Sequence, residues 1–221
     1  MTADGSLTWS LVIPVKVLAR AKSRLAKLAG PARPALALAV AADTVRAALA
    51  CAQVLQVIVV TGDQLAAAEL GRLGARVVGD EPDAGLNPAL AYGFEDAVSR
   101  EPRSGVAALS ADLPALRPAE LDRALRCAAQ WPQAIVPDAS GTGTTLYSAR
   151  PGVPFRPRFG PGSRLRHLEG GAHEISSGDL PGLRRDVDTA ADLGEAAALG
   201  LGPATAELAA RLLPGHVPER R

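Results

Sequence analysis

Short apolar runs alternate with longer Ala- and Leu-rich segments along most of the chain. Most of the short runs are rich in Val, Ile and Leu, which is typical of buried strands, whereas the longer segments have helical spacing. Strands are expected at Trp9–Val15, Val54–Thr61, Ala75–Asp80, Ser104–Asp112, Gln133–Asp138, Gly143–Ala149 and Leu183–Thr189. Helices are expected at Pro31–Cys51, 64–74, Asn87–Arg100, Pro118–Gln130, Arg164–Gly170, Ala190–Leu199 and after Pro203.

This alternation predicts an α/β fold. Strands that alternate with helices form right-handed βαβ units, so we expect a mainly parallel sheet flanked by helices on both faces. Residues 7–212 are predicted to form one domain, with Gln133–Leu183 built onto it as a lobe, and residues 213–221 a loose tail. Sheets of this kind bind ligands beyond the carboxyl ends of their strands, so candidate chemistry is expected there.

Composition excludes several classes of protein. The 221 residues carry a formal net charge of +1, which argues against a general nucleic-acid binder, and aromatic residues make up only 3%. No uninterrupted apolar stretch reaches the ~18 residues of a membrane span, and the first residues lack the charged region of a secretory signal. Cys51 and Cys127 lie far apart in Ala-rich segments. Two free thiols in a reducing compartment fit a cytoplasmic protein without a membrane or nucleic-acid partner.

The first predicted strand leads into a basic segment. From Gly5 to Ala42 there is no acidic residue. The basic residues of this stretch, which include all three lysines of the chain, are Lys16, Arg20, Lys22, Arg24, Lys27 and Arg33. A basic loop that enters a helix suits a polyphosphate, although a solvated basic helix face would have the same pattern. Neither the P-loop pattern nor G-x-G-x-x-G is present, which argues against a P-loop kinase and a dinucleotide dehydrogenase.

A second acid-free stretch lies between Asp138 and Glu169 and contains five arginines. It holds Gly141–Thr145 (GTGTT) and Phe159–Ser163 (FGPGS), the latter at the start of a predicted helix. Gly-rich turns with hydroxyls at such a point can bind a phosphate through backbone N–H groups. Ser163 could equally be a plain helix cap and GTGTT a plain hairpin turn. Two anion-binding loops in a nearly neutral protein indicate two phosphorylated ligands.

Three aspartates follow predicted strands. Asp112 ends S-A-D-L-P, while Asp186 and Asp188 lie in R-D-V-D-T, where a strand would place both carboxylates on one face. Carboxylates that meet phosphates suit Mg²⁺, and the three scattered histidines offer no zinc site. Asp188 could instead cap the next helix, and Asp186 could pair with Arg184 or Arg185. The combination favours direct attack of one phosphate on the α-phosphorus of a nucleotide, with catalysis by positioning and charge neutralisation.

The motifs resemble those of a known family, the guanylyltransferases of deazaflavin coenzyme F420 biosynthesis, which couple GTP to 2-phospho-L-lactate or phosphoenolpyruvate. The matching segments, in family order, are Ile13–Ala26, Asp80–Leu90, Ser110–Leu116, Gly141–Tyr147, Arg158–His167 and Arg184–Leu193. The first and fifth of these are the most specific. The ADLP and DVDT motifs are shared more widely with GT-A-like nucleotidyltransferases.

The resemblance implies a Rossmann-like GT-A fold, release of pyrophosphate and a set of site residues. Mg²⁺ would be held by residues matching Asp112, Asp186 and Asp188. The acid-phosphate substrate would bind at Thr145, Gly160 and Ser163, and the nucleotide at Lys16, Lys22, Arg24 and Asn87. Broader nucleotidyltransferases have a G-G-x-S-x-R type turn where this chain has PVKVLARAKSR, so side-chain charges would replace some backbone contacts.

Other functions remain open on the sequence alone. The residues do not decide between phosphoenolpyruvate and phospholactate, nor do they identify the base; the GC-rich composition favours phosphoenolpyruvate through family association. Alternatives are nucleotidyl transfer to a molybdopterin or sugar phosphate, glycosyl transfer on the same fold, and non-catalytic nucleotide binding. A downstream transferase that accepts a labile product is a further partner to consider.

Overall fold

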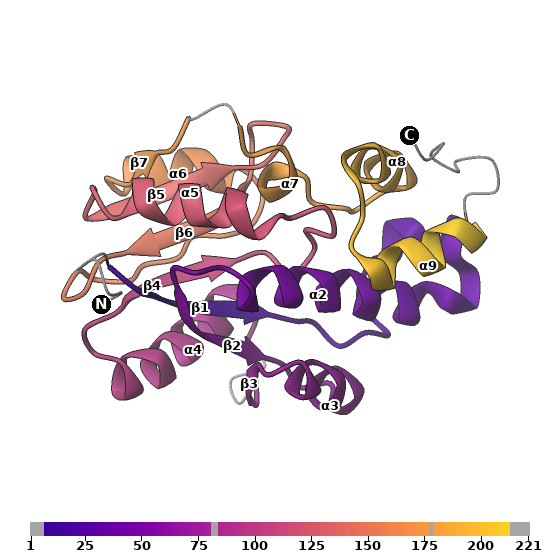
Figure 1. The fold of residues 1–221 in the computed structure, drawn as a ribbon, viewed down its shortest axis with the longest axis horizontal. Helices are drawn as coiled ribbons and strands as arrows, with labels where there is room; N and C mark the ends of the chain where they lie inside the picture. Colours follow the sequence, from indigo (N-terminus) through magenta and orange to yellow (C-terminus); the bar gives the residue numbers. More distant parts are fainter. Residues whose placement is uncertain (1–6, 81–83, 177–178, 213–221) are drawn as a thin grey trace.

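The computed structural model describes residues 7–80, 84–176 and 179–212. Its described strands form one sheet in the order β3-β2-β1-β4-β6-β5-β7, with helices on both sides (Figure 1). The strands are β1 (Trp9–Pro14), β2 (Val54–Val60), β3 (Arg76–Val78), β4 (Gly105–Leu109), β5 (Gln133–Pro137), β6 (Thr144–Ala149) and β7 (His173–Glu174). The α-helices are α1 (Ala26–Ala29), α2 (Arg33–Leu49), α3 (Gln64–Arg72), α4 (Leu86–Arg100), α5 (Pro118–Ala128), α6 (Ser163–Glu169), α7 (Pro181–Arg184), α8 (Ala190–Leu199) and α9 (Pro203–Leu212). Two 3₁₀ turns, η1 (Ser23–Leu25) and η2 (Gly30–Ala32), flank α1.

The antiparallel direction of β6 determines which loops meet at one edge of the sheet. β1 pairs in parallel with β2 and β4, and β2 with β3, whereas β6 is antiparallel to both β4 and β5. The start of β6 therefore lies at the same edge as the carboxyl ends of β1 and β4. The backbone N–H of Ser110, just beyond β4, donates to the carbonyl of Thr145 at 2.8 Å. The edge thus combines residues that follow parallel strands with residues that begin an antiparallel one.

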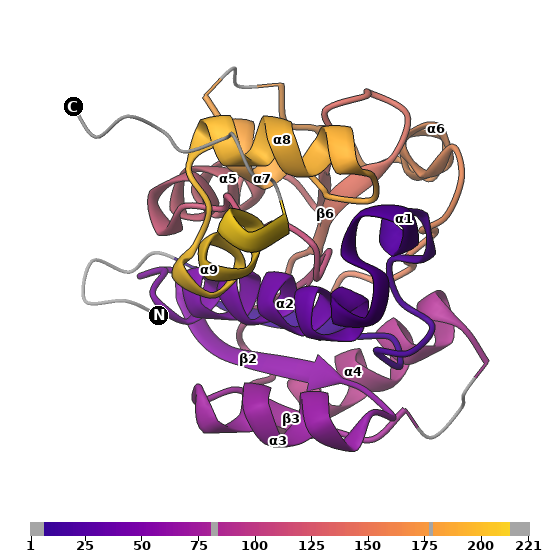
Figure 2. The ribbon, with the colours of Figure 1, turned by 90° about the vertical axis from the view of Figure 1, so that its right-hand side faces the viewer.

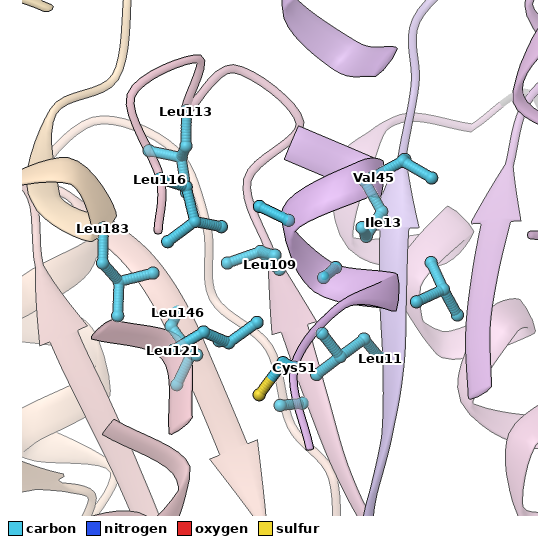
Figure 3. Close-up of a cluster of buried hydrophobic side chains, with 14 of the residues drawn as sticks. Leu11, Ile13, Val45, Cys51, Leu109, Leu113, Leu116, Leu121, Leu146 and Leu183 are labelled. Atoms are coloured by element: carbon cyan, nitrogen blue, oxygen red, sulfur yellow. The ribbon is translucent and has the colours of Figure 1, made fainter. Parts of the chain in front are cut away.

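The period-two pattern of β1 divides its side chains between two cores. Leu11 and Ile13 pack under α2 in the larger cluster, which Figure 3 shows between the sheet and that helix. Val12 points to the opposite face, where it meets α4. Gly93 allows α4 to approach closely, since a Cβ there would lie 2.5 Å from Val12 Cγ1 and 2.8 Å from Val60 Cγ2.

The C-terminal helices cover the outer side of α2. Leu193 and Ala196 of α8 pack with Leu36 and Val40 of α2, and α9 lies along α2 (Figures 1 and 2). Buried Asp43 of α2 accepts hydrogen bonds from the backbone N–H groups of Ala204 and Thr205, which begin α9. The helical segment Ser23–Leu49 has the length and apolar character of a membrane span, yet its α2 portion contributes to two core clusters of the fold.

The expected α/β fold and mainly parallel sheet are confirmed, and most expected elements lie within a few residues of their predicted ranges. The strand expected at Leu183–Thr189 is wrong: the segment begins in α7, and residues 185–188 have no regular structure. Strand β7 was not expected, because two residues are too few to produce a pattern. The tail predicted at residues 213–221 lies outside the described residues.

Candidate active site

A cavity of about 230 Å³ lies beyond the ends of β1 and β4. It is lined by Lys16 and Lys22 of the first basic loop, by Asp112 after β4, by Phe159 of the FGPGS loop and by Asp188. Four segments that the sequence singled out separately therefore meet at one cavity.

Lys22 lies between two of the three predicted metal ligands. Its Nζ is 2.5 Å from Asp112 Oδ2 and 2.9 Å from Asp188 Oδ1. Although burial lowers the pKa of Lys22, the two carboxylates raise it above its ordinary value on balance. Its φ of 54° is the one left-handed backbone conformation among the described non-glycine residues. Such a conformation is costly and persists only where the surrounding contacts enforce it.

The basic loop is held from two sides. Asp63, the N-cap of α3, accepts a hydrogen bond from the backbone N–H of Leu18 at 2.9 Å. Arg33 donates to the carbonyls of Ala19, at 2.8 Å, and Ala21. Arg33 thus positions the loop, which gives one of the basic residues in the acid-free stretch a structural task. Lys16 and Arg24 are exposed, and an Arg24 guanidinium nitrogen lies 3.9 Å from Asp188.

Asp112 is positioned through its neighbours in the chain. The hydroxyl of buried Thr44 lies 3.2 Å from the carbonyl of Ala111 and accepts a hydrogen bond from the N–H of Leu113 at 3.0 Å. The Asp112 carbonyl accepts a hydrogen bond from the N–H of Val187 at 3.0 Å. This last contact brings the DVDT segment beside the ADLP loop without any sheet pairing.

The remaining alternatives for the DVDT acids are decided by their contacts. Thr189, not Asp188, is the N-cap of α8, in a capping box with Asp192. Arg185 pairs with Glu195, while Arg184 donates to backbone carbonyls of Pro137 and Asp138. Neither arginine therefore provides the ion pair considered for Asp186.

The surroundings of Asp186 in this cluster disfavour the ionised form of its carboxyl group. Burial and, after it, the neighbouring carboxylates of Asp112, Asp138 and Asp188 raise its pKa to about 7. For Asp188, burial opposes ionisation but Lys22 and Arg24 outweigh it, so its pKa falls below the ordinary value. The cluster therefore favours an additional positive charge.

Asp112, Asp186 and Asp188 suit a divalent cation that is also coordinated by the phosphate oxygens of a substrate. Asp112 and Asp188 approach one cationic position, where the ammonium of Lys22 lies. Within the described residues no three His, Cys, Asp or Glu side chains are arranged to hold a metal ion by themselves. Mg²⁺ commonly takes one or two carboxylates and completes its shell with substrate phosphates and water. The donor set suits that mode of binding, and the assignment of the three acids as ligands stays a prediction.

The predicted acceptor residues lie around the start of α6. Ser163 is its first residue and is buried, and its N–H donates to the carbonyl of Gly160 at 3.0 Å. The N-cap is Gly162, so the interpretation of Ser163 as a plain cap is wrong. Gly160 has a φ of 121°, which favours glycine. Buried Thr145 lies on β6. Binding of substrate at these residues stays a prediction.

Asn87 holds the FGPGS loop at the Phe159 backbone. Its side-chain Nδ2 donates to the Phe159 carbonyl at 3.1 Å, and its Oδ1 accepts from the Phe159 N–H at 2.8 Å. Both polar atoms are therefore engaged, in a contact that the sequence did not suggest. A direct contact with nucleotide, as the resemblance implied, stays a prediction.

His167 holds the chain at Arg158, directly before the FGPGS loop. Its Nε2 accepts a hydrogen bond from the Arg158 N–H at 2.8 Å, which assigns the proton to Nδ1, 3.0 Å from Thr144 Oγ1. Burial, together with the charges of Arg166 and Arg158, lowers the pKa of His167 to about 4. The neutral ring is thus part of the scaffold.

Sequence reasoning missed Thr44, Asp63, Asn87 and His167 as positioning residues. Asp63 was recognisable as a helix cap, but its second bond to Leu18 joins segments 45 positions apart. Thr44 and His167 carried no local signal, because their partners are distant backbone groups.

Comparison with known proteins gives a family match and close relatives. The model of the family described as "Guanylyl transferase CofC like" matches residues 9–213. A phosphoenolpyruvate guanylyltransferase from Thermomonospora curvata is 67% identical over 209 residues, covering 95% of this chain and 92% of that protein. One from Streptosporangium roseum is 56% identical over 215 residues, covering 97% and 96%.

Solved structures agree on the fold at much lower identity. The 4-diphosphocytidyl-2C-methyl-D-erythritol synthase of Anaerococcus prevotii has a TM-score of 0.55 and 11% identity, covering 87% of this chain and 95% of that one. The Rv0371c protein of Mycobacterium tuberculosis, in complex with manganese, has a TM-score of 0.50 and 20% identity, covering 86% and 98%. These likenesses support the nucleotidyltransferase fold alone.

Proposed function

The chain belongs to the CofC-like guanylyl transferase family, and we propose that it transfers GMP from GTP to phosphoenolpyruvate in coenzyme F420 biosynthesis. The products are enolpyruvyl-diphospho-5′-guanosine and pyrophosphate. The observation that carries the proposal is the meeting of the basic loop, Asp112, Asp188 and the FGPGS loop at one cavity. Relatives at 56–67% identity over most of the chain carry the name of this activity.

The proposed chemistry is an in-line displacement at the α-phosphorus of GTP. A phosphate oxygen of phosphoenolpyruvate forms the new P–O bond, and the bond to the bridging oxygen of pyrophosphate breaks. No nucleophilic side chain is required, so the chain contributes positioning and charge. Lys16, Lys22 and Arg24 are proposed to neutralise the triphosphate, since both lysines line the cavity and Arg24, in η1, lies 3.9 Å from Asp188.

Asp112, Asp186 and Asp188 are proposed to hold Mg²⁺. When bound there, the ion neutralises phosphate charge and polarises the reacting phosphoryl group. Thr145, Gly160 and Ser163 are proposed to bind the acceptor phosphate through hydroxyl and backbone groups at the start of α6. Asn87 and His167 hold the loop that contains Gly160.

The cytoplasm is the proposed location, because the buried Cys51 and half-buried Cys127 are both free thiols. The product contains a phosphoric anhydride in which one phosphate is the ester of an enol, and such a compound is reactive. A transferase that consumes the product is therefore a proposed partner.

The test is release of pyrophosphate by the purified protein with Mg²⁺ and GTP. Phosphoenolpyruvate and 2-phospho-L-lactate are supplied in separate reactions, and the mass of the guanylylated product is read directly. Release that depends on phosphoenolpyruvate is the expected result. Release with phospholactate alone would change the acceptor, and GTP binding without release under either condition would overturn the proposed function.

A further inference from the structure

We propose that Asp80 reads the base of the nucleotide by accepting hydrogen bonds from N1–H and the 2-amino group of guanine. This proposal rests on the proposed function, since it assigns the specificity of the same nucleotide site. It concerns a residue that the motifs left without a role.

A second cavity adjoins the first at the sheet edge. It has a volume of about 410 Å³ and shares Pro14, Val15, Lys16 and Leu86 with the cavity that holds Asp112 and Asp188. Its other walls come from the basic loop at Val17 and Arg20, from the ends of β2 and β3, and from the start of α4. A nucleotide with its phosphates at Asp112 would therefore extend its base toward this second cavity. Parallel sheets commonly bind ligands in this position beyond their strands.

Asp80 supplies an unsatisfied acceptor in that second cavity. Its Oδ1 is buried and has no hydrogen-bond partner among the described residues, although the residue lines the cavity. A buried carboxylate oxygen without a partner is costly, and such groups are normally paired in native proteins. Rotation of the carboxylate about χ2 would turn this oxygen toward the cavity, where a ligand that donates hydrogen bonds would satisfy it.

The other polar groups of the cavity suit the opposite edge of the base. Lys16 and Arg20 line it and are donors only. Guanine presents donors at N1 and the 2-amino group and acceptors at O6 and N7, the pair that Lys and Arg commonly contact. Val17, Leu86 and Ala89 supply apolar surface for the ring faces. Among the described side chains, the cavity therefore offers the Asp80 carboxylate as an acceptor and Arg20 as a donor, which complement the two edges of guanine, while Lys16 lies on the side of the phosphates.

The same chemistry rejects adenine. Adenine has an acceptor nitrogen at position 1 and only a C–H at position 2, so the carboxylate would face a lone pair and stay unpaired. A site built around a required hydrogen bond rejects analogues that lack it far more strongly than an apolar pocket rejects a change in size.

The experiment compares GTP, ITP, XTP and ATP in the wild type and in Asp80→Asn and Asp80→Ala. Inosine lacks the 2-amino group, so the wild type is expected to prefer GTP over ITP by about 10- to 100-fold in kcat/KM. Asp80→Ala should reduce that preference to about twofold or less. Xanthine carries a carbonyl at position 2, which an amide N–H can donate to. Asp80→Asn should therefore lose GTP activity and gain XTP activity over the wild type, which an unfolded variant cannot do.

Asp96→Asn is the matched control, because Asp96 lies on α4 and pairs with Arg76 of β3 outside the cavity. It should keep the wild-type ratio of GTP to ITP. Equilibrium binding of GTP and ITP is measured in parallel without acceptor, so the role of Asp80 is decided even if no pyrophosphate is released. A wild-type GTP-to-ITP ratio in both Asp80 variants, in turnover or in binding, would overturn the assignment.

Discussion

The ammonium of Lys22 lies 2.5 Å from a carboxylate oxygen of Asp112, although 90 positions separate the two residues in the chain. The same ammonium holds Asp188 at 2.9 Å and so joins the basic loop to both acidic loops. Two carboxylates that approach one position repel each other unless a cation lies between them, and the ammonium of Lys22 is that cation.

Replacement of Lys22 by Met is expected to destabilise the protein in the absence of divalent metal. The carboxylates of Asp112 and Asp188 would lose their common partner, at a cost of about 1–2 kcal/mol after allowance for the half-exposed Asp188. The melting temperature should fall by roughly 2–8 °C. Thermal unfolding with EDTA and with Mg²⁺ measures this, and Mg²⁺ should stabilise the variant more than the wild type. Equal stabilisation of both proteins by Mg²⁺ would show that Mg²⁺ does not take the place of the Lys22 ammonium between Asp112 and Asp188.

Asp188→Asn is expected to lower turnover at least about a hundredfold while the fold persists. An amide binds a divalent cation more weakly than a carboxylate and weakens the pair with Lys22. Turnover of this variant at saturating substrates is compared with that of Glu195→Gln, which removes the carboxylate of α8 that pairs with Arg185. A variant that keeps more than a tenth of the wild-type rate would remove Asp188 as a metal ligand.

Asn87→Ala is expected to raise the KM for phosphoenolpyruvate about tenfold, because both hydrogen bonds that hold the Phe159 backbone are lost. The KM for GTP should change by about twofold or less. Initial-rate kinetics with each substrate varied in turn separate the two effects. A larger rise in the KM for GTP than for the acceptor would instead support the nucleotide-binding role that the family resemblance implied.

The contribution of His167 to the free energy of unfolding is expected to fall as the pH drops from about 6.5 to about 4, while Asp186, whose pKa is raised to about 7, contributes in the opposite direction. The pKa of His167 is about 4 in the folded chain, against 6.5 for an ordinary histidine, so the unfolded state takes up a proton first. The loss from this residue is on the order of 3 kcal/mol across that window, and none is expected above it. Urea unfolding of the wild type and His167→Gln at several pH values measures the slope. As the pH falls below 6.5, the variant should gain stability relative to the wild type, and a constant difference between the two proteins would show that His167 does not carry the effect.

The sequence alone determined the alternation of elements, because burial of apolar residues at periods of two and 3.6 is a local property. It also indicated the chemistry: lysines confined to one acid-free segment, acids in S-A-D-L-P and R-D-V-D-T, and a Gly-rich loop before a helix. Each of these signals is a set of residue types within a few neighbouring positions, so it could be recognised without a structure.

The tertiary structure decided how those segments meet. The expected strand at Leu183–Thr189 begins in α7 and continues without regular structure, and the backbone bond from Val187 to Asp112 makes its placement depend on a partner 75 positions away. The contacts of Lys22 with the acids, of Asn87 with Phe159 and of Asp63 with Leu18 likewise join distant parts of the chain. Such contacts arise only when the sheet brings its loops to one edge, because no local pattern of residues specifies a partner across the fold.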